Sequence, residues 1–167
     1  GDFEVRFDGL PESNVIYGEG EITSPNEPRD GNTLGIFYIG PAENLSMEGG
    51  ILIAGPEIPD AIRNDISGNL ENAVTKLTDA WGYAPEIPPA VIITYDQNWH
   101  GQSWKGGVLE EVITFHLRGM DLSGDTSEFT DHLRNTSLHE AIHVWNGTLF
   151  ESSENSEQSW VHEGAAE

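Results

Sequence analysis

Apolar residues recur every three or four positions between residues 60 and 81, and this spacing predicts an amphipathic helix. Because an α-helix turns once in about 3.6 residues, such positions share one face that can be buried against a core. Gly82 follows directly, and glycine commonly ends helices, so we expect the helix to stop there. The apolar positions are Ile62, Ile66, Leu70, Ala73, Val74, Leu77 and Trp81.

Strand patterns lie on both sides of this helix. Residues 1–57 hold short apolar or alternating runs separated by turn residues, which predicts a β-rich N-terminal scaffold. Residues 90–95 form a β-branched run typical of a central strand, and residues 108–117 alternate as a half-buried strand does. The loop expected at residues 96–106 carries Trp99, His100 and Trp104, which either cover the edge of the core or line a cleft.

A second helix is predicted over residues 126–146, with Gly147 at its end. Residues 125–128 match a capping box, which satisfies backbone N–H groups in the first helical turn. The acidic turn before it, at residues 121–125, lacks the ligand pattern of an EF-hand, so a plain turn is favoured over a calcium site. Residues 151–158 are an acidic connection, and a further helix is expected over residues 159–167.

The chain of 167 residues is long enough for one domain with a buried core. We divide it into the scaffold of residues 1–57 and a region of residues 58–167, and we expect the two to form one compact unit. No apolar run approaches the length that spans a bilayer. The absence of cysteine excludes disulfides and thiolate metal ligands.

The net charge of the chain limits the classes of partner that it can bind. Asp and Glu number 29 against 7 Lys and Arg, which gives a formal net charge of -22. Such a field repels nucleic acids and anionic membranes, so neither is expected as a partner. The acidity and the lack of cysteine favour an exported protein, extracellular or periplasmic. The sequence does not indicate an oligomeric state.

The strongest chemical signal is His-Glu-x-x-His at residues 139–143, inside the second predicted helix. Residues four apart lie on one helix face, so His139 and His143 can both bind one metal ion. Glu140 lies about 100° round the helix and can reach a metal-bound water without being a ligand. Catalytic zinc sites usually have three protein ligands and an open position, so a third ligand must come from elsewhere.

The longer pattern, His-Glu-x-x-His-x-Trp followed by Trp-x-x-Glu-Gly-x-Ala at residues 160–166, resembles the gluzincin metallopeptidases. The aminopeptidase-N-like and glycyl-aminopeptidase-like branches are the most similar. This resemblance implies that His139, His143 and Glu163 bind zinc and that Glu140 is the general base in the hydrolysis of a peptide or protein substrate by a zinc-activated water. It is specific over residues 137–167.

Other residues compete for roles at this centre. His162 is an alternative third ligand, because imidazole binds zinc well, but Glu163 occupies the ligand position of the family. Glu167 either accepts a hydrogen bond from a ligating imidazole or faces solvent. His132 shares the helix face of His139 but lies about 10 Å away, which is too far to share the metal.

Residues 107–111, Gly-Val-Leu-Glu-Glu, resemble the Gly-x-Met-Glu-Asn segment of the aminopeptidase-N-like enzymes. The resemblance implies an edge strand that pairs with substrate backbone at Gly107, with Glu110 holding the free amine of the substrate. Leu and Glu replace the Met and Asn of that segment. An ordinary solvent-facing glutamate is therefore the alternative for Glu110, and aminopeptidase and endopeptidase activities are not separated.

The resemblance also implies an α+β fold of the zincin type, with a mostly antiparallel sheet, an edge strand over the cleft and the zinc helix beneath it. The related enzymes use a tyrosine far downstream to stabilise the oxyanion, whereas the last tyrosine here is Tyr95. We therefore expect this chain to be a fragment of a longer enzyme and to be weakly active alone. The alternative is a zinc-binding or interaction module without turnover.

Overall fold

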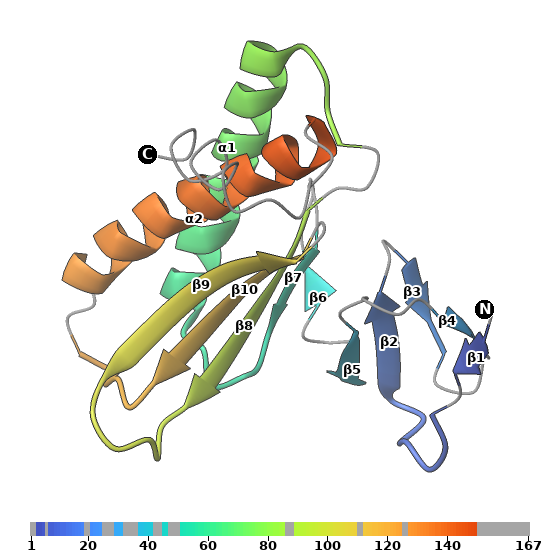
Figure 1. Cartoon of the computed structure of the whole chain (residues 1–167). Coiled ribbons are helices and arrows are strands. Elements are labelled where there is room, and N and C mark those ends of the chain that lie inside the picture. Colours follow the sequence, from blue (N-terminus) through green and yellow to red (C-terminus); the bar gives the residue numbers. More distant parts are fainter. Residues whose placement is uncertain are drawn as a thin grey trace.

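The computed structural model of the chain describes residues 3–5, 7–18, 21–24, 29–31, 37–41, 45–46, 51–85, 89–109, 112–124 and 127–149. Figure 1 shows the arrangement of the elements in this part of the chain. In chain order they are β1 (Phe3–Val5), β2 (Asn14–Gly18), β3 (Glu21–Thr23), β4 (Arg29–Gly31), β5 (Tyr38–Pro41), β6 (Leu45–Ser46), β7 (Ile51–Ala54), α1 (Asp60–Trp81), β8 (Ala90–Asp96), β9 (Ser103–Leu109), β10 (Val112–Arg118) and α2 (Ser127–Leu149).

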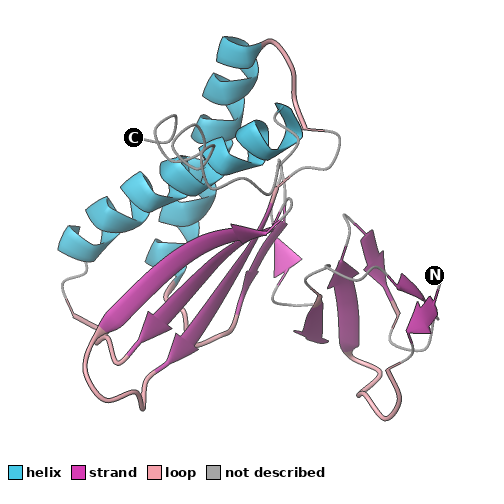
Figure 2. Ribbon diagram, viewed as in Figure 1, coloured by secondary structure: helices cyan, strands magenta, loops and turns pink. Residues whose placement is uncertain are grey.

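The largest sheet has the strand order β6-β7-β8-β10-β9, and both helices lie on one of its faces (Figures 1 and 2). Strands β7, β8 and β10 are parallel, whereas β6 and β9 run antiparallel to their neighbours. The fold is therefore α+β, as predicted. The expectation of a mostly antiparallel sheet is wrong for this sheet, because the crossover through α1 makes β7 and β8 parallel.

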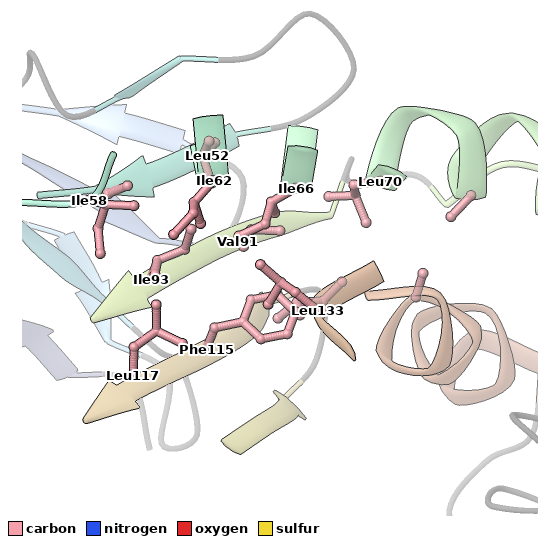
Figure 3. Packing of buried hydrophobic residues seen from close by; sticks show 14 of the residues in the cluster. Leu52, Ile58, Ile62, Ile66, Leu70, Val91, Ile93, Phe115, Leu117 and Leu133 are labelled. Atoms are coloured by element: carbon pink, nitrogen blue, oxygen red, sulfur yellow. The ribbon is translucent and has the colours of Figure 1, made fainter. Parts of the chain in front are cut away.

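Residues 52–54 of β7 and 90–93 of β8 are buried on both faces of the sheet, which explains the continuous apolar runs of these two strands. Side chains alternate along a strand, so Leu52 and Val91 point towards the helices while Ile53 and Ile92 point away from them. The helix side forms the main core, in which α1 and α2 pack against β8 and β10 (Figure 3). Tyr17 of β2 packs against the other side.

The N-terminal strands form two smaller antiparallel sheets, β3-β2-β5 and β1-β4. Tyr17 and Tyr38 connect the first of these to the five-stranded sheet by packing on its outer face. Strands β6 and β7 precede residue 57 but belong to the five-stranded sheet. Residues 32–36, within the predicted N-terminal scaffold, lie outside the described residues.

The first helix has the predicted bounds. α1 spans Asp60–Trp81, and five of its predicted apolar positions are buried, while Trp81 is exposed. Gly82 adopts a left-handed conformation with φ of 77°, and its N–H donates to the carbonyl of Thr78. This is the usual way in which a glycine ends a helix.

The prediction over residues 108–117 is wrong in one respect, because this stretch belongs to a hairpin and not to a single strand. Leu109 lies opposite Val112, so the chain reverses between them. The loop expected over residues 96–106 correspondingly ends earlier, since β9 begins at Ser103. Because Leu109 is paired with Val112 and Val108 with Ile113, the positions that face the main core change from even to odd numbers across the reversal. A period of two is therefore broken at the turn, and Glu111, which interrupts the apolar row, is the sequence signal of that break.

The second helix is longer than predicted, because α2 continues through Gly147 to Leu149. A glycine inside a helix costs only about 1 kcal/mol relative to alanine, and tertiary packing readily exceeds that amount. Residues 125 and 126 of the predicted capping box lie outside the described residues. Within the described ranges, neither helix has the length and apolar character required to cross a membrane.

Gly82, directly after α1, and Gly68, inside it, provide a matched test of how the helix ends. We expect Gly82→Ala to destabilise the protein by about 1–2 kcal/mol, since only glycine adopts positive φ without strain. Gly68→Ala, at an exposed position inside the helix with no neighbour within 4 Å, should stabilise it by about 0.5–1 kcal/mol. Urea unfolding of both variants measures the two effects, and the same sign for both would contradict this account.

Candidate metal centre

The rotation of α2 determines which of its side chains face the core. Its buried apolar residues occupy one side and include Leu133, Ala141, Val144 and Trp145. At about 100° per residue, His139 and His143 then lie on the opposite side, where both are half-buried. Glu140 lies between the two sides and is 8% exposed.

The two histidines converge as the sequence predicts. Their Nε2 atoms are 3.1 Å apart, and the rings meet edge to face with centroids 4.7 Å apart. Two imidazole nitrogens bound to one tetrahedral zinc, each at 2.0–2.1 Å, are about 3.3 Å apart. The observed pair therefore fits two ligands of a single metal ion with little movement of either ring.

Strand β9 lies close to α2 at Gly106. A methyl group placed on Gly106 would lie 2.8 Å from Oε1 of Glu140 and 2.7 Å from Cγ2 of Thr136. The strand can approach the helix this closely because Gly106 has no side chain. This contact holds β9 directly beside the carboxylate predicted to be the general base.

A cavity of about 530 Å³ opens between β9 and the outer side of α2. Both His139 and Glu140 line it. Two of its lining residues belong to β9 and the others to α2. They are Trp104, Gly106, Asn135, Thr136, Leu138, His139 and Glu140.

The aromatic residues expected in one loop have separate positions. Trp104 lies on β9, lines the cavity and packs against the main core, so both interpretations of it hold. Its ring lies 5.8 Å from that of His132. Trp99 is instead 48% exposed, with the guanidinium of Arg118 4.6 Å above its ring.

Of the other predicted site residues, one belongs to the described part of the chain. Glu163, Glu167 and the alternative ligand His162 lie outside the described residues, as does Glu110, whereas Gly107 lies on β9. Among the residues that the structure does describe, no three His, Cys, Asp or Glu side chains are grouped to hold a metal ion. This part of the chain supplies two of the three expected ligands.

Reciprocal hydrogen bonds hold the helix just beyond His143. The hydroxyl of Tyr83 donates to the carbonyl of Trp145 at 2.8 Å, and the indole Nε1 of Trp145 donates to the carbonyl of Tyr83 at 3.2 Å. Burial raises the pKa of Tyr83, which keeps its hydroxyl a donor. Sequence reasoning missed this pair, because the two residues are far apart in the chain and no local pattern connects them.

The acidic turn before α2 is a turn, as predicted. The backbone N–H and the hydroxyl of Ser123 both donate to Oδ1 of Asp121, at 3.0 and 2.6 Å. These hydrogen bonds lower the pKa of Asp121. The Asp121 side chain is thus engaged in a local turn of the kind that aspartate often forms.

Comparison of the chain with models of protein families, with curated proteins and with solved structures finds no match.

The close contact at Gly106 can be tested with its neighbour. We expect Gly106→Ala to destabilise the protein by about 1–3 kcal/mol, because the added methyl group collides with Glu140 and Thr136. Gly107→Ala is the control, since its methyl group would meet only Oγ1 of Thr114, at an ordinary 3.7 Å. Thermal and urea unfolding measure both.

A second substitution tests whether the collision with Thr136 causes the loss of stability in Gly106→Ala. Thr136→Ser removes the methyl group nearest to the added carbon, so it should recover part of the loss in the Gly106→Ala background. Equal effects of Gly106→Ala and Gly107→Ala, or no coupling between positions 106 and 136, would contradict the contact described.

Proposed function

We propose that this chain is a zinc metallopeptidase of the zincin type, with zinc held by His139, His143 and Glu163. The observation that carries the proposal is the convergence of the two Nε2 atoms, 3.1 Å apart, on the helix that also presents Glu140 to the cavity beside β9. The mixed sheet with an antiparallel edge strand next to this helix supports the zincin assignment.

When bound, zinc would polarise the scissile carbonyl and lower the pKa of a water molecule. The protein's own contribution is the positioning of a proton carrier. Glu140 accepts the proton that the attacking water loses and passes it to the nitrogen of the leaving amine, while the C–N bond breaks. Its low exposure and its contact with β9 hold the carboxylate in one place for both transfers.

The substrate would lie along β9. Among the described residues this strand pairs only with β10, so its other edge offers backbone groups to an extended peptide. Gly106 and Gly107 have no side chains to obstruct that approach. In this proposal Gly107 contacts the substrate backbone, and Glu110 holds the amino terminus if the enzyme is an aminopeptidase.

The role of Glu140 is tested by Glu140→Gln, which keeps the shape of the side chain but cannot accept a proton. We expect cleavage of a peptide library, followed by mass spectrometry, to fall by about 10²–10⁴-fold while zinc binding persists. Glu71→Gln, at an exposed position on α1, should leave cleavage unchanged.

Two other outcomes are decisive. Cleavage by Glu140→Gln at the rate of the unsubstituted protein would contradict the assigned base. A protein that binds zinc through the three proposed ligands and cleaves no peptide would instead favour the alternative, a zinc-binding or interaction module without turnover.

A further inference from the structure

We propose that the cavity between β9 and α2, which forms a groove open to solvent, contains a subsite for one large apolar side chain of a bound peptide. Trp104 and Leu138 are the walls of this subsite. The inference rests on the proposed function in one respect, since it assumes that the peptide lies along β9. Its test measures binding and therefore does not require turnover.

The first wall is formed by Trp104. Side chains two apart on a strand share a face, so Trp104 faces α2 as Gly106 does. The contact of its ring with that of His132, at 5.8 Å and 36° between planes, agrees with this direction. Gly106, two positions further along the strand, lines the same cavity as Trp104.

The second wall is Leu138. Of the large hydrophobic side chains exposed in the described part of the chain, Ile22, Trp81, Trp99 and Leu138, only Leu138 lines the cavity. It is 44% exposed. Leu138 and Glu140 differ by about 200° around the helix, so Leu138 flanks the groove on the side opposite to β9.

The floor between these walls consists of uncharged side chains. Asn135 and Thr136 lie one turn before His139 and Glu140, which are the titratable side chains among the lining residues. Beyond those two groups, the groove presents an indole, a leucine side chain, a threonine and an amide. Such a surface favours a large aliphatic or aromatic group over a charged one.

The position of the subsite follows from strand geometry. Gly106 lies against Glu140, and Trp104 lies two residues further along β9, which corresponds to about 7 Å. A peptide that adds antiparallel to β9 runs in the opposite direction to the strand. Trp104 therefore lies beside the peptide residues on the C-terminal side of the scissile bond. The selected residue is therefore two positions after the residue opposite Gly106, on the leaving-group side.

The experiment uses Glu140→Gln, which holds a peptide without cleaving it, and labelled peptides of Gly and Ser with a single Phe, Leu or Lys at each position in turn. Fluorescence anisotropy should show tighter binding for Phe and Leu at one position, by about tenfold, and no gain for Lys. In the same background, Leu138→Ala and Trp104→Ala should each reduce that preference to about twofold or less. Trp99→Ala, which alters an exposed indole away from the cavity, should preserve it.

Leu138→Ala is the decisive variant, because its exposed side chain contributes little to folding, whereas Trp104 also packs against the core. No preference at any position, or a preference that survives Leu138→Ala, would overturn the subsite. Cleavage by the unsubstituted protein is measured separately. Binding preference without cleavage contradicts only the peptidase, and cleavage without preference contradicts only the subsite.

Discussion

The burial of one side of α2 against the five-stranded sheet determines the rest of the candidate centre. Trp145 and Ala141 are fully buried, as are Ile113 and Phe115 of β10 in the same core. Full burial of a large apolar side chain contributes about 1.5–3 kcal/mol, so a different rotation of the helix would be costly. Once the rotation is fixed, the spacing of four residues directs His139 and His143 to the outer side together.

The second constraint is the close approach of β9. The hairpin with β10 places β9 at the edge of the sheet, and Gly106 allows it to lie against Glu140 and Thr136. Glu140 is 8% exposed and lies against β9, a placement that would suit the proton carrier of the proposed reaction. The cavity beside this contact is lined by Trp104 and Gly106 of β9 and by residues of α2 that include Leu138.

Features with a local cause could be predicted from the sequence. The apolar spacing and Gly82 define α1 within one stretch, and His139 and His143 face the same way because they are four apart on a helix. The hairpin of β9 and β10 was not predicted, although Glu111 interrupts the apolar alternation between Leu109 and Val112, where the chain reverses. The role of Gly106 was missed and the two interpretations of Trp104 stayed open, since both depend on contact between β9 and α2, which no local pattern encodes.

The central claim is that His139 and His143 bind one zinc ion together with Glu163, and zinc content measured by elemental analysis tests it most directly. We expect one zinc per chain in the purified protein, lost in His143→Ala and in Glu163→Ala. Zinc should be retained in His132→Ala, which removes an imidazole on the same helix face about 10 Å away. A protein without zinc after zinc has been supplied, or retention of zinc by His143→Ala, would contradict the account.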